Sequence, residues 1–331
     1  MIIKTVSYPR AALIGNPSDG YFGKTISFTF SNFQADVTLY QTPELEILPG
    51  RRDHNTFGSL HALADDVNSY GYYGGIRIIK AALKKFFDYC TQNNIQLDDR
   101  NFSIRYHTSI PSHLGLAGSS AIITACMRAL CSFYEVVIAN PEFANLVLSV
   151  ETEELNIGAG LQDRVAQAYQ GITYMDFSKE IMDAQGYGYY IPLKPSKLPN
   201  IYIAYKQDLS EGSEVVHNNL RYRFNNGDKD VIHAMKRFAG LAESAKEMFE
   251  TADYSGFPGL MNKNFDLRAS ICAISRENRQ MVEQARSVGA SAKFTGSGGA
   301  IIGTFEDDGM FNRLKEELYK IKVEVIIPEI V

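Results

Sequence analysis

The spacing of apolar positions along the chain predicts an alternation of strands and helices. Alternating or β-branched apolar residues are typical of strands, and they recur at residues 2–7, 25–33, 36–40, 44–48, 102–108, 201–205, 291–295, 300–304 and 323–327. Apolar residues three and four positions apart indicate helices, and they recur at 74–89, 121–134, 140–157, 165–169, 231–251, 277–288 and 309–319. This order favours an α+β chain whose sheets are mostly antiparallel.

A proline-rich stretch divides this pattern. Pro192, Pro195 and Pro199 fall close together with two lysines, which is typical of a linker. We therefore predict two α+β domains with a boundary near residue 195, one covering residues 1–195 and the other residues 196–331.

Composition narrows the class of protein. The 331 residues carry a net charge of −5, with 45% hydrophobic and 21% charged residues, as expected of a globular chain. There is no basic run, so no nucleic-acid partner is predicted. The first ten residues are too polar for a signal peptide, and Arg128 and Glu135 interrupt the apolar stretch 121–139, so no membrane partner is predicted. The four cysteines form no CxxC pair, which indicates free thiols and a cytoplasmic protein.

A loop of small residues precedes the helix predicted at 121–134. It reads Gly115-Leu116-Ala117-Gly118-Ser119-Ser120-Ala121. Glycines allow close approach of a ligand to the backbone, and the free N–H groups at a helix start favour an anion such as a phosphate chain. Ser119 and Ser120 could cap the helix or hold a metal ion. The alternative is a tight turn with serine caps. The Gly-Lys-Ser/Thr ending of a Walker A loop is missing.

Carboxylates follow at the end of the helix predicted at 140–157. Glu153 and Glu154 come three and four residues after Val150, on the same predicted inward face. An inward carboxylate needs a partner, and Mg²⁺ suits it. Asp163 follows a glycine-rich turn and could cap the next helix, pair with Arg164 or take part in chemistry.

Two further segments could contact a ligand. The turn Gly296-Ser297-Gly298-Gly299 joins two predicted strands, either as a bulged hairpin or as a backbone surface for a ligand. Near the N-terminus, Asn16, Ser18, Asp19 and Tyr21 offer donors and acceptors that suit sugar hydroxyls, although a polar turn would explain them equally.

Taken in order, these segments resemble the motifs of the GHMP small-molecule kinases, a family named for galacto-, homoserine, mevalonate and phosphomevalonate kinase. The family has an N-terminal Pro-Gly-Arg/Lys segment, a Pro-x-x-x-Gly-Leu-Gly-Ser-Ser-Ala loop and a Thr-Gly-x-Gly-x-Gly type turn. Their counterparts here are Pro9-Arg10, the loop from Pro111 to Ala121 and residues 295–299. The resemblance spans nearly the whole chain. It implies the two-domain α+β GHMP kinase fold, with an N-terminal ribosomal-protein-like α/β domain and a C-terminal ferredoxin-like α+β domain.

Within this family, residues 15–27, 160–165 and 285–299 most resemble the glucuronokinases, which use ATP to phosphorylate the anomeric hydroxyl of D-glucuronate. Galactokinases have Glu-His-Thr-Asp where this chain has Asn16-Pro17-Ser18-Asp19, so galactose is not expected as a substrate. The resemblance implies a cytoplasmic sugar-1-kinase that uses ATP and Mg²⁺. A homodimer is left open.

The resemblance also implies roles for individual residues. Asp163 matches the catalytic aspartate, and Arg10 matches the basic residue that steadies this carboxylate and the transferring phosphoryl group. Ser120 and Glu153 match the Mg²⁺ ligands, with Glu154 as the alternative because the loop before Asp163 is one residue shorter than in mevalonate kinases. The implied phosphate loop comprises Pro111, Gly115, Leu116, Ala117, Gly118, Ser119, Ser120 and Ala121. The implied sugar site comprises Asn16, Ser18, Asp19, Tyr21, Arg164, Gly296, Ser297 and Gly298.

A glucuronate substrate would also need a cation for its carboxylate, for which arginine is the better residue where both oxygens are bound. The candidates are Lys24, Arg164, Lys206, Arg221 and Arg223. We favour Arg164, which could instead pair with Asp163. The candidates for an adenine site are Arg51, Arg52, Asp53, Tyr70, Tyr72 and Tyr73.

Other functions stay open from the sequence. The same machinery could act on a heptose, on galacturonate or on a neutral hexose, because substrate identity changes easily within one fold. A sensor that binds ATP and sugar without turnover is a second class, disfavoured by the joint presence of Asp163, Arg10, Ser120 and Glu153. A dinucleotide-dependent oxidoreductase is disfavoured because no glycine cluster gives GxGxxG with an acidic residue about 20 positions later.

Overall fold

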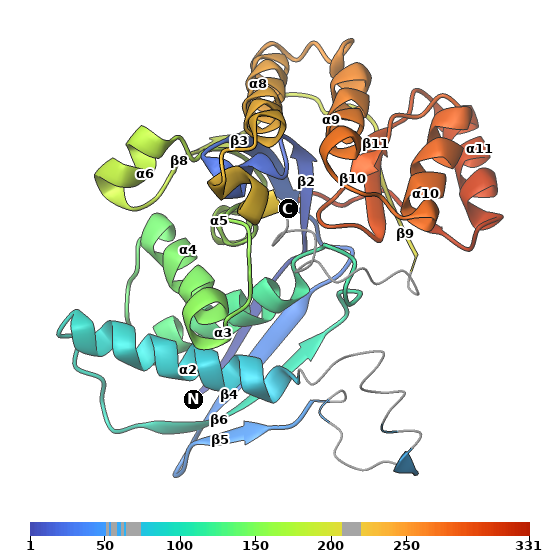
Figure 1. Ribbon diagram of the computed structural model, residues 1–331. Coiled ribbons are helices and arrows are strands. Elements are labelled where there is room, and N and C mark those ends of the chain that lie inside the picture. The colour runs from blue at the N-terminus through green and yellow to red at the C-terminus, as the bar shows by residue number, and fades with distance from the viewer. Residues whose placement is uncertain (51–52, 54–57, 61–62, 64–73, 207–219) are drawn as a thin grey trace. The chain divides into compact units, whose positions relative to one another are not determined.

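The computed structural model describes the whole chain except residues 51–52, 54–57, 61–62, 64–73 and 207–219. Within the described residues, helices alternate with three four-stranded sheets (Figure 1). All strand pairs in these sheets are antiparallel except β5 with β6. The predicted α+β class with mostly antiparallel sheets is therefore confirmed. No helix in the described part of the chain is long and apolar enough to cross a membrane.

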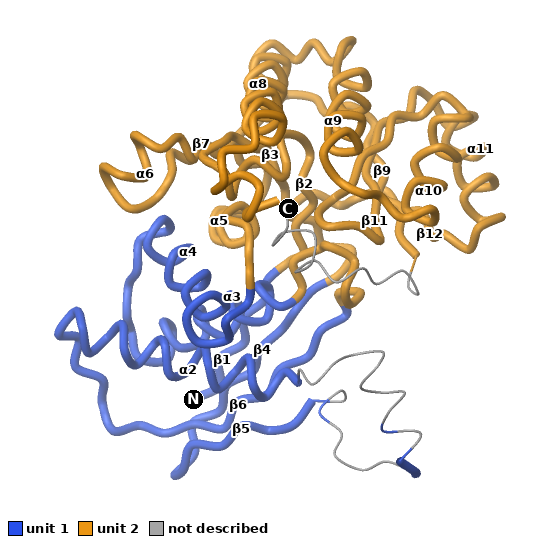
Figure 2. Tube along the Cα trace, in the orientation of Figure 1, with its two compact units in different colours: residues 1–7, 34–109, 119–157 blue, residues 8–33, 110–118, 158–331 orange. Residues whose placement is uncertain are grey.

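The chain divides into two compact units that do not follow its sequence order (Figure 2). Unit 1 comprises residues 1–7, 34–109 and 119–157, and unit 2 comprises residues 8–33, 110–118 and 158–331. The chain passes between the units several times before residue 158, and residue 195 is not a point of division. The prediction assumed continuous domains, whereas strands near the N-terminus pair with strands formed much later in the chain.

Unit 1 contains the sheet β1-β4-β6-β5, made of Ile2–Ser7, Ala35–Thr42, Asn101–Thr108 and Glu46–Leu48. Helices α2 (Gly75–Gln92), α3 (Gly118–Phe133) and α4 (Asn140–Ser149) complete it (Figure 1).

Hydrogen bonds and ring contacts attach two of these helices to the sheet. Thr5 Oγ1 on β1 donates to the carbonyl of Ala125 on α3 at 2.6 Å. The ring of Phe102 on β6 lies 5.2 Å from that of Phe133 on α3. Phe86 on α2 stacks on Tyr134, just after α3. The middle and the end of α3 are thus held against the sheet.

Unit 2 contains two sheets. The first has the order β2-β3-β7-β8, made of Arg10–Ile14, Lys24–Thr29, Ile172–Asp176 and Tyr189–Leu193. All five residues of β2 are buried. A 3₁₀ turn, η1 (Ser18–Tyr21), links β2 to β3, and α5 (Gln162–Tyr169) leads into β7. Helix α6 (Lys179–Gln185) joins β7 to β8.

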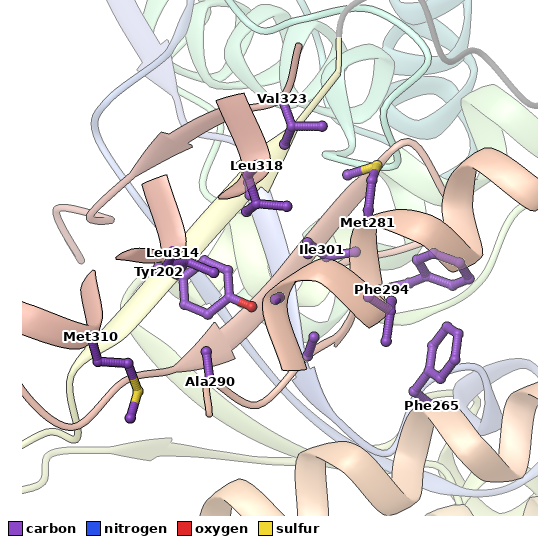
Figure 3. Close-up of a cluster of buried hydrophobic side chains, with 14 residues drawn as sticks. Tyr202, Phe265, Met281, Ala290, Phe294, Ile301, Met310, Leu314, Leu318 and Val323 are labelled. Atoms are coloured by element: carbon purple, nitrogen blue, oxygen red, sulfur yellow. The ribbon is translucent and has the colours of Figure 1, made fainter. Parts of the chain in front are cut away.

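The second sheet of unit 2 has the order β10-β11-β9-β12, made of Lys293–Phe294, Ala300–Thr304, Ile201–Tyr205 and Glu324–Ile326. Tyr202, Leu314, Leu318 and Ile301 pack together where α10 (Arg276–Ser287) and α11 (Asp308–Tyr319) meet this sheet (Figure 3). Helices α8 (Lys229–Thr251) and α9 (Phe257–Ile271) run beside each other (Figure 1). The sequence pattern did not predict α9.

The helix predicted at 140–157 ends earlier than expected. Helix α4 stops at Ser149 and is followed by a π-helical turn, η2 (Val150–Glu154), in which the N–H of Leu155 bonds the carbonyl of Val150 at 3.1 Å. This bond spans five residues instead of four. The inward face therefore passes from Val150 to Leu155, which is 4% exposed, and not to Glu153 or Glu154.

The predicted linker is partly a strand. Pro192 lies inside β8, opposite Thr173 of β7. A proline is tolerated there because β8 is at the edge of its sheet, where one side of the strand has no partner. The apolar residues before the prolines therefore continue the sheet.

Two glycine substitutions test the packing of unit 2. An added Cβ at Gly303 on β11 would lie 1.7 Å from the backbone oxygen of Ser291, whereas at Gly240 on α8 nothing lies within 4 Å. We expect Gly303→Ala to lower the free energy of unfolding by about 1–3 kcal/mol through overpacking. We expect Gly240→Ala to raise it by about 0.5–1 kcal/mol, since alanine favours a helix. Urea unfolding measures both, and a Gly303→Ala protein as stable as the parent would contradict this strand packing.

Candidate active site

The centre of the candidate site in unit 2 is an ion pair between Arg10 and Asp163. Arg10 begins β2, and Asp163 lies in the first turn of α5. The Nε and Nη2 atoms of Arg10 lie 2.8 and 2.5 Å from Oδ1 of Asp163. The side chain of Arg10 is 5% exposed and that of Asp163 is 18% exposed. Two contacts on one oxygen fix the carboxylate, and Oδ2 accepts no hydrogen bond from the described residues.

Arg10 also joins the two predicted glycine-rich loops. Its Nη1 donates to the carbonyl of Gly115 at 3.2 Å and to that of Thr295 at 2.5 Å. The loops are in direct contact, because a Cβ on Gly296 would lie 2.3 Å from the carbonyl oxygen of Gly115. Gly115 has a positive φ of 63°, which glycine adopts without strain. Only glycines allow this approach.

Two further cations hold the turn at residues 294–297. Arg268 on α9 donates to the carbonyls of Gly296 at 2.6 Å and Ser297 at 2.8 Å. Lys293, fully buried, donates to the carbonyls of Ala12 at 2.6 Å and Phe294 at 2.7 Å. Burial, with the nearby charges of Arg268 and Arg10, lowers the pKa of Lys293 well below its usual value.

This anchoring leaves the N–H side of the turn open. The backbone N–H groups of Gly296, Ser297 and Gly298 donate to no acceptor among the described residues, whereas that of Gly299 donates to Asn278 Oδ1 at 2.9 Å. Consecutive unpaired N–H groups form a concave anion-binding surface. The turn can therefore receive a negatively charged ligand.

Asp19 lies on η1 and binds the start of α5. Its Oδ2 accepts from the N–H groups of Leu161 and Gln162 at 2.8 and 3.2 Å, and its Oδ1 accepts from Gln162 Nε2 at 3.0 Å. Burial and the nearby charge of Asp163 raise the pKa of Asp19. Asp19 thus acts on the helix that carries Asp163, a role the sequence did not suggest.

The other predicted sugar-site residues of this segment differ in their contacts. Ser18 closes its own turn by bonding the backbone of Lys24 at 3.0 and 3.2 Å. Asn16 is 2% exposed and its Oδ1 has no hydrogen-bond partner among the described residues. The hydroxyl of Tyr21, also buried, has none either. Asn16 and Tyr21 therefore keep polar atoms for a ligand, and Ser18 does not.

Arg164 is buried beside the Arg10–Asp163 pair. It is 3% exposed, donates to the carbonyl of Gly160, and lies 3.7 Å from Oδ2 of Asp163. Burial and the charge of Arg10 lower its pKa to about 9, which leaves it a cation at neutral pH. Of the two sequence alternatives, the structure shows the proximity to Asp163, and the ligand contact stays a prediction.

In unit 1, the predicted metal-binding serine faces a different glutamate from the one predicted. Ser120 Oγ donates to Glu151, with both carboxylate oxygens at 3.1 Å, and the residues are 2% and 3% exposed. Glu153 is 63% exposed in its side chain and pairs with Lys85, while Glu154 pairs with Lys84 at 3.2 Å. The π-helical turn η2 explains the difference, because it changes which carboxylate turns inward.

The residues of the predicted phosphate loop take the expected local form. The helix α3 begins at Gly118, so Ser119, Ser120 and Ala121 form its first turn, where N–H groups have no acceptor within the helix. Leu116 is buried, and Ala117 has a positive φ of 60° and accepts a hydrogen bond from Gln167. Pro111 is half-buried.

The predicted adenine site lies mostly outside the described residues, which include Asp53 but not Arg51, Arg52, Tyr70, Tyr72 or Tyr73. Asp53 itself accepts from the hydroxyl of Tyr106 and the N–H of Gly50, both at 2.7 Å.

Sequence reasoning missed three groups of the candidate site. Glu151 is adjacent to the predicted carboxylates, but a π-helical turn leaves no clear pattern in sequence. Arg268 lies on the helix that was not predicted. Lys293 fell inside the strand predicted at 291–295, with no role assigned to it. A lysine usually lies at the surface, so nothing in its sequence context indicated burial.

Comparisons with known proteins agree with this geometry. The model of the GHMP kinases N terminal domain matches residues 77–171. The chain is 45% identical to Glucuronokinase 1 of Arabidopsis thaliana over 302 residues, which cover 89% of this chain and 83% of that protein. It is equally similar to Probable glucuronokinase 2 of the same plant, over 89% of this chain and 82% of that protein.

The fold is also shared with a solved kinase structure. The structure of the Methanococcus jannaschii mevalonate kinase is 22% identical, with a TM-score of 0.73, and the match covers 100% of this chain and 98% of that one. This similarity shows that the chain has the fold of those kinases. From the family model and the extent of identity to the plant proteins, the chain belongs to the GHMP kinase family, alongside the glucuronokinases.

Proposed function

We propose that this protein is a sugar kinase that transfers the γ-phosphoryl group of ATP to the anomeric hydroxyl of D-glucuronate, giving ADP and the sugar 1-phosphate. The observation that carries the proposal is the Arg10–Asp163 pair at the start of a helix. One carboxylate oxygen is fixed by Arg10, and the other accepts no hydrogen bond from the described residues, with Arg164 3.7 Å away. The names of the Arabidopsis relatives supply the substrate.

Asp163 is the proposed proton acceptor. As the anomeric oxygen bonds to the γ-phosphorus and the bond to the β-phosphate oxygen breaks, the hydroxyl proton passes to Oδ2 of Asp163. A sugar anomeric hydroxyl is more acidic than an ordinary alcohol, so a carboxylate base suffices. Arg10, bonded to the other oxygen, orients the carboxylate and offers positive charge to the transferring group.

The phosphates of ATP are proposed to lie against backbone N–H groups. The start of α3 and the turn at Gly296, Ser297 and Gly298 both present such groups. Phosphoryl transfer depends chiefly on positioning and on neutralising charge, which these groups provide without chemical steps of their own.

Ser120 and Glu151 are proposed to hold Mg²⁺. Their hydroxyl and carboxylate oxygens are the hard donors that this ion prefers, and both side chains are buried and adjacent. No group of three His, Cys, Asp or Glu side chains forms a metal cage among the described residues. Magnesium is commonly held by one or two carboxylates together with substrate phosphates. When bound, Mg²⁺ would neutralise charge on those phosphates.

A panel of free sugars tests the substrate. We expect ADP release from ATP·Mg²⁺ with glucuronate and much less with galacturonate, glucose, galactose, mannose or a heptose. Turnover with only a neutral sugar or a heptose would support the kinase activity and contradict glucuronate as the substrate. If no sugar of the panel causes ADP release while ATP still binds, the protein would instead be a sensor that binds ATP without turnover.

Replacing the proposed base tests the mechanism. Asp163→Asn should lower kcat at least about a hundredfold, since an acid–base group is lost, while ATP binding measured by calorimetry persists. Asp183→Asn is the matched control, because Asp183 on α6 is 61% exposed and pairs with Lys179. Equal activity of Asp163→Asn and the control would remove Asp163 from the chemistry.

Paired glutamate substitutions test the metal ligand. Glu151→Gln should raise the Mg²⁺ concentration at half-maximal activity by about tenfold or more. Replacing a residue that only hydrogen-bonds to a metal ligand already lowers metal affinity by about that factor, and a ligand itself should matter at least as much. Glu153→Gln should leave it unchanged, since that side chain is 63% exposed. The reverse result would show that Glu153 turns inward, as the sequence alone predicted.

A further inference from the structure

The carboxylate of a uronic acid needs a cation that acidic groups of the chain do not already hold. Three of the five candidate cations are engaged. Lys24 pairs with Asp176 at 3.2 Å and with Glu243. Arg223 donates to Asp228 at 2.8 Å and to the carbonyl of Ile271 at 2.6 Å. Arg164, as described above, is buried and donates to the backbone of its own helix start.

The two remaining candidates occupy different parts of unit 2. The backbone N–H of Lys206 bonds the carbonyl of Gly299, so Lys206 lies beside the glycine turn already proposed for phosphates. Arg221 lies against η1 instead. Its guanidinium is 5.6 Å from the ring centre of Tyr21, and its Nη2 is 3.2 Å from the position of a Cβ on Gly20.

Arg221 has its charge available. It is exposed, and its guanidinium forms no ion pair or hydrogen bond with any described residue. Among the described residues, the guanidinium makes a cation–π contact with the face of the Tyr21 ring. This contact does not use the N–H donors at the edge of the guanidinium plane. A planar guanidinium with free edge donors suits both oxygens of a carboxylate.

Tyr21 supplies an unpaired donor at the same place. Its side chain packs among Leu220, Phe238 and Leu267, and its ring centre is 5.1 Å from that of Phe224. It is 5% exposed, and its hydroxyl has no partner among the described residues. Burial raises the pKa of Tyr21 to about 12, so the hydroxyl keeps its proton at neutral pH. A buried hydroxyl without a partner calls for a ligand to explain it.

The same turn connects these residues to the proposed base. Tyr21 and Asp19 both belong to η1, and Asp19 binds the N–H groups that open α5, where Asp163 lies. Asp19 and Asp163 would repel a uronate, and Arg10 is already paired with Asp163. The positive charge of Arg221, which lies against η1, offsets that repulsion.

We infer that Arg221, together with the hydroxyl of Tyr21, binds the carboxylate of the uronic acid substrate and selects it over uncharged sugars. The guanidinium donates to both carboxylate oxygens and the phenol donates to one of them. This inference rests on the proposed function, because it assigns a subsite to the same reaction.

The test compares glucuronate with glucuronamide, whose amide has no charge. Arg221→Gln should raise KM for glucuronate about 10- to 100-fold, as expected for hydrogen bonds to a charged group. It should leave kcat, KM for ATP and kcat/KM for glucuronamide nearly unchanged. Tyr21→Phe should raise KM for glucuronate by a smaller factor, about 3- to 10-fold. Arg221→Lys, which keeps the charge without the planar fork, should fall between the parent and Arg221→Gln.

Matched controls come from exposed neighbours. Arg237→Gln on α8 and Tyr222→Phe, whose side chain is 71% exposed, should both behave as the parent. Melting temperatures of all variants show whether each is folded, and Arg221 is exposed, so folding is expected to survive its loss.

Three results would overturn the assignment of Arg221. One is an unchanged KM for glucuronate in Arg221→Gln, and another is an equal loss with glucuronate and glucuronamide, which would indicate a structural role. The third is a selective loss in Lys206→Gln instead, which would assign the carboxylate to Lys206. A parent protein inactive on glucuronate would overturn the proposed function, and this inference with it.

Discussion

The structure of unit 2 depends on how the buried charge of Arg10 is satisfied. A guanidinium removed from water must be paired and hydrogen-bonded, since leaving it uncompensated is costly. Its partners are Asp163, Gly115 and Thr295, which are 153, 105 and 285 residues away along the chain. One side chain therefore brings the proposed base and two glycine-rich loops to one place. The arrangement that stabilises this part of the fold and the arrangement proposed for chemistry are the same set of bonds.

The carbonyl groups of the C-terminal glycine turn show a related constraint. Arg10, Arg268 and Lys293 bind the carbonyls of residues 294–297 from the protein side. Each peptide unit has its N–H and carbonyl on opposite sides, so fixing the carbonyls inward directs neighbouring N–H groups outward. Basic side chains thus prepare an anion-binding surface without facing the anion themselves.

Much of the fold could be predicted from the sequence because period-2 and period-3.6 patterns are strong in its strands and long helices. Helices α8, α10 and α11 and strands β1, β6, β9 and β11 lie close to their predicted bounds. Helix α9 was missed because its buried residues include Asn264 and Arg268, which weaken the apolar stripe. The interleaving of the two units was not predicted, because local hydrophobic patterns do not determine which distant strands pair.

The motif order indicated Arg10, Asp163 and Ser120 as candidate residues, and the structure gives each of them a buried or partly buried acidic or basic neighbour. The glutamate beside Ser120 could not be predicted. A single π-helical hydrogen bond, from the N–H of Leu155 to the carbonyl of Val150, changes which side chains turn inward. The hydrogen-bond partners of Asp19 and Ser18 could not be predicted either, since both side chains bond to backbone groups that only the folded chain brings near them.

The interleaved units also set the order in which a ribosome can complete them. Every segment of unit 1 has been synthesised by residue 157, whereas unit 2 needs the chain to its end. Strand β2 is made among the first residues, yet all five of its residues are buried in the finished protein, and Ala12 bonds Thr295 near the C-terminus. Because domains fold as units during translation, unit 1 can form while this apolar strand still awaits its partners. The newly made chain must therefore keep β2 from other contacts until its later partners, such as Thr295, have been made.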